Sequence, residues 1–332
     1  MEQRFLNALA DNYDMGEMTL SLLGQGAKHV YHIQRQNGPD WVVRIFPPKP
    51  GPGLAHAANR QAQMLAYLEA HDYPTEWVVR TRAGELVAPV EDWALLVTTY
   101  VGRSLHAWAP ASGSFTSHEA MTVTPDIYRQ LGMALAKLHT VPIDPAQNLP
   151  RGGMLPKREL TWIGPYVVDA AEHVTPEYQT WYDELLPAIQ QAHHCEDLDF
   201  VLVHCDPNLG NAAIDEQGKV VLIDWDVVGL GPAVLDLGCL LINCVTPDFA
   251  PDADAVHAVM DGYRQHSILS ALELERLADM VPSQILVTLG GYLPDIMKGE
   301  ISEDELIYGL TYPQWQAKYR AATGIVAIAQ DY

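Results

Sequence analysis

Two carboxylates and one amide occur at a defined spacing in the second half of the chain. Asn211 follows Asp206 by five residues, and Asp224 comes after a glycine-containing turn. Apolar and β-branched residues at 201–203 and 220–223 predict two short strands joined by this turn. Such a ribbon would bring the three side chains to one end, where they form a corner rich in oxygen acceptors.

This set of groups is suited to phosphoryl transfer. One carboxylate can position an attacking hydroxyl and accept its proton, while an amide oxygen and a second carboxylate hold magnesium on nucleotide phosphates. The protein-kinase pattern H-R-D-x-x-x-x-N followed by D-F-G has the same order and the same Asp-to-Asn spacing. A lone aspartate in an Asn- and Gly-rich stretch is usually a turn residue. The joint spacing with His204 therefore favours the catalytic interpretation.

The same segment resembles the aminoglycoside phosphotransferase and choline kinase superfamily. That family has H-G-D-x-x-x-x-N and then I-D-[WF]-[DE]; here H-C-D-P-N-L-G-N stands at 204–211 and I-D-W-D at 223–226. Flanking segments fit the family in the same order, at 102–105, 131–139, 229–232 and 235–238. The resemblance, which covers about residues 19 to 240, implies that Asp206 is the catalytic base. It also implies that Asn211 and Asp224 are ligands of Mg²⁺.

The resemblance gives the neighbouring residues supporting roles. His204 would support the catalytic loop, and Asp236 would brace that loop by hydrogen bonding. Asp226 has three open readings: a second metal, the substrate, or a cap on the next turn. Cys205 stands where the family has glycine, and we expect its small side chain to be tolerated without acting as a nucleophile, because no activating base is evident.

The first third of the chain contains candidates for nucleotide binding. The loop with Gly24 and Gly26 lacks the third glycine of a dinucleotide or kinase loop, so alone it indicates only a hairpin turn. Because it precedes Arg44 and the catalytic motif, a role in covering phosphates is favoured. Arg44 lies in the β-rich run 41–46, at the position of the phosphate-binding lysine of protein kinases. A guanidinium can bind phosphate oxygens with two N–H groups.

Two further features concern how the nucleotide is held. The usual partner of the cation is a Glu on the next helix, and that position aligns with Gln61, which can form a hydrogen bond but no ion pair. Gln61 therefore favours an alternative, a kinase-like nucleotide-binding or regulatory protein with little catalysis. Counting back from Gly102, we expect Thr98 and Tyr100 in the hinge, where backbone groups pair with adenine.

The elements that must position these residues change in character along the chain. β-rich runs and one convincing helix, at 54–70, fill the first third, and helical patterns such as 127–139 and 178–192 dominate the remainder. This organisation predicts an α+β, bilobal, protein-kinase-like fold. Residues 1–102 would form an antiparallel β N-terminal lobe with one main helix that binds nucleotide. Residues 103–332 would form a larger, mostly helical lobe for catalysis and acceptor binding.

Composition excludes several classes of protein. The 332 residues include 20 Lys and Arg against 42 Asp and Glu, a net charge of −22, which argues against nucleic-acid binding. No apolar run reaches the ~18–20 residues of a membrane helix, and no signal-peptide pattern opens the chain, so we expect a cytoplasmic protein. The four cysteines form no C-x-x-C pair, which argues against structural zinc or redox chemistry. An NAD-dependent enzyme is disfavoured because strands and helices do not alternate. Oligomeric state is left open.

The acceptor is expected to be a small molecule. Only eleven residues separate Asp224 from Asp236, too few for the activation segment that docks a peptide, and no A-P-E signature follows. Acidic residues are concentrated at 246–310, with 12 acidic against 3 basic side chains, which either attract a cationic acceptor or form a solvated surface. We expect ATP or GTP, with Mg²⁺, to phosphorylate a hydroxyl of an acceptor such as an aminoglycoside-like amino-sugar. Homoserine and choline-type metabolites remain alternatives.

Overall fold

The computed structural model describes residues 1–24, 29–48, 54–105, 123–144, 155–191, 197–307 and 309–332. The chain divides into two compact units. The first unit comprises Met1–Arg103 and Ala213–Asp226, and the second comprises Ser104–Ala212 and Val227–Tyr332. The first division falls one residue from the expected boundary. The segment Ala213–Asp226, which the sequence assigned to the second lobe, belongs to the first unit.

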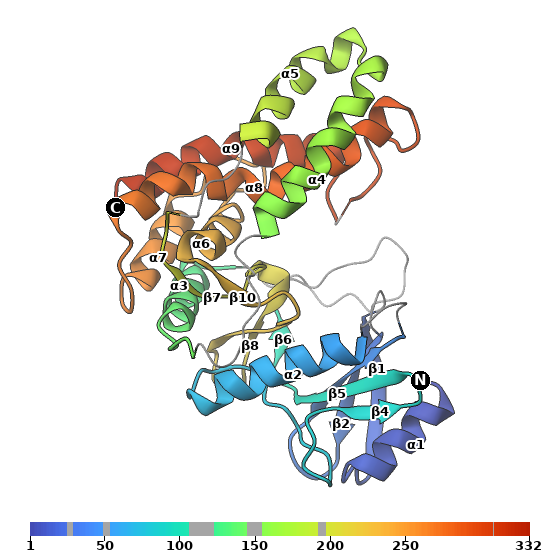
Figure 1. Ribbon diagram of the computed structural model, residues 1–332. Coiled ribbons are helices and arrows are strands. Elements are labelled where there is room, and N and C mark those ends of the chain that lie inside the picture. The colour runs from blue at the N-terminus through green and yellow to red at the C-terminus, as the bar shows by residue number, and fades with distance from the viewer. Residues whose placement is uncertain (25–28, 49–53, 106–122, 145–154, 192–196, 308) are drawn as a thin grey trace. The chain divides into compact units, whose positions relative to one another are not determined.

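A five-stranded sheet is the centre of the first unit (Figure 1). Its strands pair antiparallel in the order β1-β2-β3-β5-β4. The elements of this region are α1 (Gln3–Asn12), β1 (Met18–Gly24), β2 (His29–Arg35), β3 (Trp41–Phe46), α2 (Leu54–Ala70), β4 (Ala88–Val90) and β5 (Trp93–Thr99). The antiparallel sheet with one main helix agrees with the expected N-terminal lobe.

The sheet is buried on both faces because helices pack on each of them. Trp41, Val43 and Ile45 of β3 belong to an apolar cluster that also includes Phe5 and Leu9 of α1. Successive side chains of a strand point to opposite faces, so Arg44 lies on the other face of β3. All six residues of β3 are buried, and α2 packs against β3 and β5. Arg44 is therefore a buried cation on the face of the sheet opposite to the apolar cluster.

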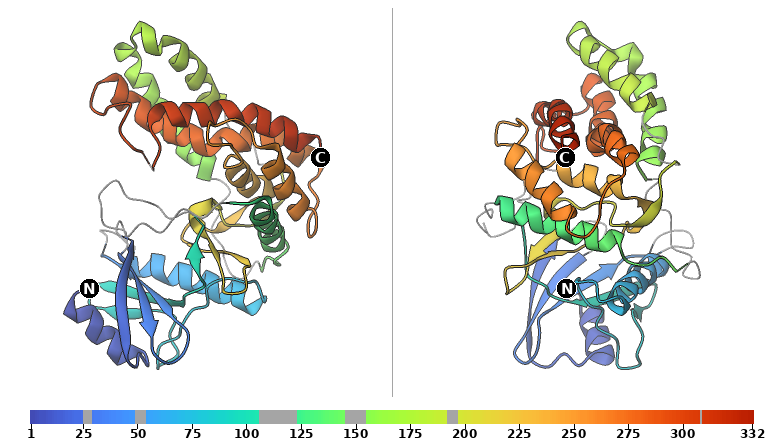
Figure 2. Two further views of the ribbon diagram at one scale, coloured as in Figure 1. Left: turned by 180° about the vertical axis from the view of Figure 1, so that it is seen from behind. Right: turned by 90° about the vertical axis from the view of Figure 1, so that its left-hand side faces the viewer.

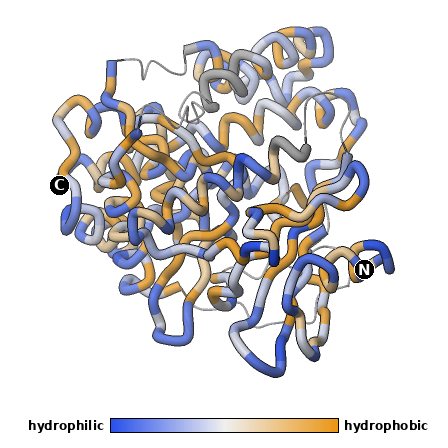
Figure 3. Tube along the Cα trace, turned by 60° about the horizontal axis from the view of Figure 1, so that its bottom comes forward, coloured by the Kyte–Doolittle hydropathy of each residue, from blue (hydrophilic) through white to orange (hydrophobic). Residues whose placement is uncertain are grey.

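The second unit is mainly helical. Its helices are α3 (Pro125–His139), α4 (Leu155–Asp169), α5 (Pro176–Gln191), α6 (Ala233–Leu241), α7 (Ala253–Tyr263), α8 (Ala271–Met297) and α9 (Tyr312–Gln330). Every residue of α6 is buried, and the helix packs against α8, which also contacts α4 and α9 (Figure 2). Figure 3 shows hydrophobic and hydrophilic residues alternating along the helices, as amphipathic helices require. No helix among the described residues is both long and apolar enough to cross a membrane.

Close packing of α3 on α7 depends on two glycines. A Cβ at Gly262 would lie 1.9 Å from the carbonyl oxygen of Arg129, and one at Gly132 would lie 2.1 Å from that of Val259. Both distances are far below van der Waals contact, so only glycine allows these backbones to approach. The end of α3, which contains His139, is held in place by this packing.

The structure has five further short strands: β6 (Arg103–Ser104), β7 (Phe200–Val203), β8 (Ala212–Ile214), β9 (Val220–Leu222) and β10 (Gly229–Pro232). β7 pairs with β10, whereas the order β6-β8-β9 defines a second small sheet. The prediction that the strands at 201–203 and 220–223 pair as a hairpin is therefore wrong. The predicted turn is present, with Gly218 at φ +78°, but it joins β8 to β9. β8 was not predicted because it is short and rich in alanine, which has a low strand propensity.

Candidate active site

The loop of the second unit that the sequence predicts to be catalytic is organised around Asp206. Asn211 donates its amide to Asp206 Oδ2 at 2.9 Å, and Asn208 donates to Asp206 Oδ1 at 2.7 Å. Asn208 Oδ1 accepts from the backbone N–H groups of Gly210, at 2.7 Å, and Asn211, at 3.2 Å. The structure thus brings two predicted residues together and adds Asn208, which sequence reasoning missed. Asn208 caps the short helical turn Leu209–Asn211, and the preference for Asn at such positions could have indicated its role.

Asp236 binds the backbone of this loop through hydrogen bonds, which is the kind of contact expected of it. The carboxylate is fully buried and accepts from the backbone N–H groups of His204 and Cys205, both at 2.7 Å. His139 Nε2 lies 3.1 Å from Asp236 Oδ2, and its Nδ1 lies 2.8 Å from the hydroxyl of Tyr263. The loop is therefore anchored to α6, α3 and α7. Tyr263 gave no signal in the sequence, because a buried tyrosine on a helix is ordinarily a core residue.

The two residues before Asp206 are buried in the second unit. His204 is fully buried, which suits a supporting role. Cys205 has φ +72°, a left-handed conformation that costs a non-glycine residue about 1–2 kcal/mol and explains why glycine suits this position. Burial raises the pKa of the Cys205 thiol far above its ordinary value, with further contributions from Asp236 and Asp206. The thiol stays protonated and is a poor nucleophile.

Arg44, in the first unit, forms a buried ion pair with Glu76. Nη1 of Arg44 donates to Glu76 Oε2 at 2.8 Å, and Nη2 donates to Oε1 at 2.9 Å. The expectation that Gln61 leaves Arg44 without a carboxylate partner is wrong. Glu76 lies in the segment after α2, and no sequence pattern indicated that this segment would provide the partner of Arg44. Gln61 is buried on α2, and its amide has no hydrogen-bond partner among the described residues.

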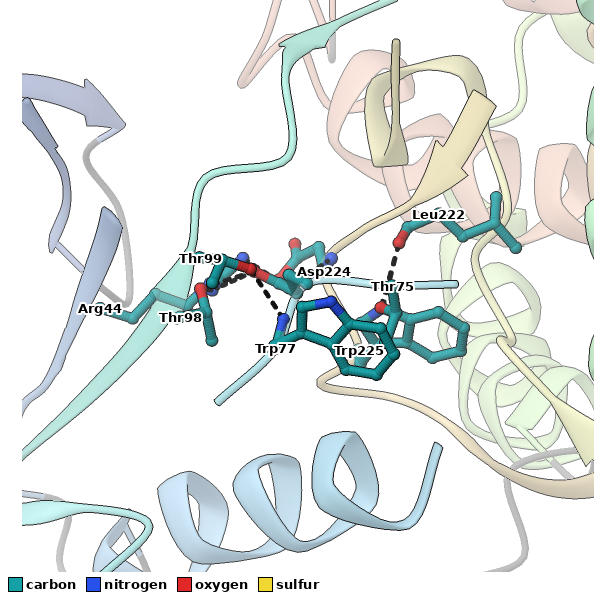
Figure 4. A network of polar contacts seen from close by, with 9 residues as sticks. Arg44, Thr75, Trp77, Thr98, Thr99, Leu222, Asp224 and Trp225 are labelled. Atoms are coloured by element: carbon teal, nitrogen blue, oxygen red, sulfur yellow. Dashed lines mark hydrogen bonds and ion pairs between the residues drawn. The ribbon is translucent and has the colours of Figure 1, made fainter. Parts of the chain in front are cut away.

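The charge of Arg44 is secured by its surroundings. Burial lowers the pKa of the guanidinium, but attraction by Glu76, Asp224 and Asp226 outweighs this, so the pKa lies above its ordinary value. The hydroxyl of Thr98 donates to Glu76 Oε2 at 2.8 Å and accepts from Arg44 at 3.1 Å. Figure 4 shows this network. Arg44 is therefore a permanent cation close to Asp224, the predicted metal ligand, and to Asp226, whose expected role was left open.

Asp224 and Asp226 flank an anchored tryptophan. Trp225 is fully buried, and its indole N–H donates to the carbonyl of Leu222 at 3.2 Å. Asp224 and Asp226 on either side of it are partly exposed, and Asp224 has φ +67°. Burying the middle residue fixes the segment while leaving two carboxylates at the surface of the unit. The two aspartates thus lie together near Arg44, and the predicted approach of Asp224 to Asp206 stays a prediction.

The remaining nucleotide-binding candidates occupy the sheet. Thr98 is fully buried, and its residue pairs with Val42 of β3, so its hydroxyl serves the Arg44 network. The backbone N–H of Tyr100 donates to the carbonyl of Asp40 at 2.8 Å, so an adenine contact at Tyr100 would have to use its carbonyl or ring. Gly24 pairs with Val30 at the end of β1. Gly26 lies outside the described residues, and the nucleotide contacts of all these positions stay predictions.

The donor set suits a magnesium–nucleotide complex. Mg²⁺ is usually held by one or two protein oxygen ligands together with substrate phosphates. Asn211 in the second unit offers an amide oxygen, and Asp224 in the first unit offers a carboxylate oxygen. Each is a ligand type that Mg²⁺ accepts, and their joint binding of a metal stays a prediction. Within the described ranges, no group of three or more His, Cys, Asp or Glu side chains could hold a metal ion by itself.

Comparisons with known proteins agree with this architecture. The model of the APH family, described as a phosphotransferase enzyme family, matches residues 19–269. No curated protein matches the chain. Similar solved structures include amicoumacin kinase hAmiN, with 17% identity, a TM-score of 0.62, and coverage of 98% of this chain and 93% of that one. A spectinomycin phosphotransferase, APH(9)-Ia, has 13% identity, a TM-score of 0.64, and coverage of 98% and 97%.

A microcompartment-associated aminopropanol kinase is also similar, with 19% identity, a TM-score of 0.55, and coverage of 100% of this chain and 97% of that one. Identities this low establish the fold alone, and the expected α+β protein-kinase-like fold is confirmed. The family match covers most of the chain, and its description specifies the reaction class. The chain therefore belongs to the APH family of phosphotransferase enzymes.

Proposed function

We propose that this phosphotransferase moves the γ-phosphoryl group of ATP or GTP to a hydroxyl of a small, amine-bearing acceptor. The main observation behind the proposal is the network of hydrogen bonds that fixes the predicted catalytic loop. Asp206 is held by the amides of Asn208 and Asn211, and Asp236 fixes the backbone just before it. A carboxylate presented this rigidly can orient an acceptor hydroxyl and take its proton during transfer.

The nucleotide side of the reaction rests on the first unit. Arg44 supplies a permanent positive charge for the phosphates, and Asp224 with Asn211 would hold Mg²⁺. The metal, when bound, neutralises phosphate charge as the transferred group leaves. Each of these side chains contributes position and charge rather than covalent chemistry, as phosphoryl transfer requires. The intact Arg44–Glu76 pair removes the main argument for a protein with little catalysis.

Two observations support an amine-bearing acceptor: the negative charge of residues 246–310 and the acceptors of similar structures. Residues 246–310 hold 12 acidic and 3 basic side chains, a field that attracts cations. One similar structure is an aminopropanol kinase, and others act on spectinomycin or amicoumacin. The acidic field would raise the local concentration of such an amine. A cytoplasmic location, where nucleoside triphosphates and Mg²⁺ are abundant, completes the proposal.

The test is an acceptor panel that measures ADP or GDP release. Hydroxylated amines, amino-sugars, choline-type alcohols and homoserine are each offered with ATP or GTP and Mg²⁺. We expect acceptor-dependent release for at least one amine, with weaker apparent affinity as salt rises. Asp206→Asn should lower turnover by at least about a hundredfold while nucleotide binding persists. The exposed Asp331→Asn serves as the matched control and should retain full activity.

Two results would contradict the transfer reaction, and a third would contradict the cationic acceptor. Retained turnover in Asp206→Asn would remove the assigned base. Release of nucleoside diphosphate that no hydroxylated acceptor stimulates would indicate a hydrolase instead of a kinase. An acceptor affinity that salt leaves unchanged would reject the cationic acceptor while leaving the transfer reaction standing.

A further inference from the structure

The carboxylate that holds Arg44 comes from an unexpected element. Glu76 lies beyond the end of α2, and the side chains of Arg44 and Glu76 are only 6% and 2% exposed. Two parallel hydrogen bonds of 2.8 and 2.9 Å join them, which is the strongest geometry for a guanidinium and a carboxylate. Gln61 on α2 takes no part in this pair. Arg44 is therefore positioned by a segment other than the helix expected to do so.

The segment that contains Glu76 is fixed on both sides. The backbone N–H of Trp77 donates to the hydroxyl of Thr99 at 2.9 Å, and the N–H of Thr99 donates to the carbonyl of Trp77 at 2.9 Å. The hydroxyl of Thr75 donates to the carbonyl of Leu222 at 3.4 Å. These contacts tie the residues before and after Glu76 to β9 and β5 (Figure 4). Glu76 is thus held rigidly between the strand that precedes Asp224 and the end of β5.

Glu76 itself joins three groups that the proposed reaction uses or that lie beside it. Its two oxygens accept from the guanidinium of Arg44, and Oε2 also accepts from the hydroxyl of Thr98 at 2.8 Å. Oε1 accepts from the backbone N–H of Asp224 at 3.4 Å. Asp224 has the left-handed φ of +67°, a conformation that needs support from its surroundings. One buried carboxylate therefore touches both the phosphate-binding cation and the backbone of the expected metal ligand.

We propose that Glu76 is a positioning residue that sets Arg44 and Asp224 together, so that phosphate binding and metal binding are coupled through one side chain. The inference rests on the proposed function. The negative charge of Glu76 holds Arg44 in place, and its acceptor oxygen holds the Asp224 backbone in the conformation that directs the aspartate side chain. Loss of Glu76 should therefore affect the nucleotide and the metal at once and leave the acceptor site unaffected.

The test compares Glu76→Gln with the wild-type protein and with Glu69→Gln, an exposed carboxylate on α2. Nucleotide affinity is measured by calorimetry over a range of Mg²⁺ concentrations, and KM for nucleotide and acceptor is measured separately. We expect Glu76→Gln to weaken metal-dependent nucleotide binding at least about tenfold, because a charge-assisted pair is lost. The Mg²⁺ concentration for half-maximal binding should rise, while KM for the acceptor stays within twofold. Glu69→Gln should match the wild type.

A second variant guards against failure to fold. Thr98→Val keeps the buried volume and the ion pair but removes one hydroxyl from Glu76, and we expect a smaller shift of the same Mg²⁺ dependence. A merely structural Glu76 would lower thermal stability and leave the Mg²⁺ dependence of the folded protein unchanged in both variants, which would overturn the inference. A wild-type protein that binds Mg²⁺-nucleotide but transfers no phosphate would refute the proposed function and leave the coupling measurable.

Discussion

A buried lysine in the second unit allows one stability prediction to be worked from the structure. Lys318 of α9 is 9% exposed, and its ammonium donates to Asn243 Oδ1 at 2.8 Å and lies 5.4 Å from the ring of Trp315. Among the described residues, no carboxylate forms an ion pair with it. Burial lowers the pKa of Lys318 to about 8, although the nearby Cys239 and Cys244 act in the opposite direction. The positive charge therefore destabilises the folded protein at neutral pH.

The size and direction of the effect follow from linkage. The ordinary pKa of lysine is 10.5, so between about pH 8 and 10.5 the unfolded chain binds the proton that the folded chain has released. Stability contributed by this site therefore rises with pH across that range. At pH 7 the charged form costs about 3 kcal/mol, since each pKa unit corresponds to about 1.4 kcal/mol.

The perturbation is Lys318→Met, which keeps the length of the side chain and removes the charge. The variant escapes the cost of about 3 kcal/mol but leaves the Asn243 oxygen without its donor, a loss of about 1–2 kcal/mol. The net gain of about 1–2 kcal/mol at pH 7 should raise Tm by roughly 1–3 °C, because the unfolding entropy of a chain of 332 residues is about 0.7 kcal/mol/K. By about pH 10 the lysine is neutral in the folded protein and the cost of its charge falls to about 1 kcal/mol, so the lost hydrogen bond to Asn243 should leave the variant no more stable, or slightly less stable, than the wild type.

The assay is thermal unfolding of both proteins at pH 7, 8, 9 and 10 at constant ionic strength. Lys219→Met, at an exposed position, is the matched control and should show no change in its Tm difference with pH. The other titrating groups are common to the proteins, so the difference in Tm isolates Lys318. A Tm difference for Lys318→Met that stays constant from pH 7 to pH 10 would refute the reasoning.

Two more changes follow from the packing of the second unit. Asp236→Ala leaves two buried backbone N–H groups of the catalytic loop without acceptors and should lower stability by about 3–5 kcal/mol, measured by urea unfolding. Unchanged stability would remove its bracing role. Gly262→Ala places a Cβ 1.9 Å from the carbonyl of Arg129 and should cost about 2–3 kcal/mol. Gly291→Ala, where no atom lies within 4 Å, should be neutral or slightly stabilising, and equal effects of the two changes would contradict the packing account.

The catalytic loop could be predicted because its information is local. The spacing of Asp206 and Asn211 sets their contact within a single turn, and the motif places Asp236 on the helix that follows. The division between β-rich and helical parts was equally accessible, because periodicity reports it directly. Asp206 and Asn211 are close in the sequence, and Asp236, 32 positions from His204, could be predicted only because a motif of the resembled family marks it.

The missed features depend on residues that are far apart. Glu76 lies 32 positions from Arg44, and no periodicity or motif links them. Alignment by helix position pointed to Gln61, since it assumes that the carboxylate stays on α2. The pairing of β7 with β10 was hidden for a similar reason, because glycine-rich β10 has little strand propensity. Tertiary packing decided each of these cases.

Transfer of labelled phosphate tests the central claim most directly. ATP labelled in its γ-phosphoryl group is incubated with the protein, Mg²⁺ and the acceptor selected from the panel. The products are then separated, and their masses are measured by mass spectrometry. The account predicts that the label appears on the acceptor, with the mass of one phosphoryl group added at a hydroxyl, and that Asp206→Asn abolishes this product. Label found only as inorganic phosphate, or an equal yield from Asp206→Asn, would contradict it.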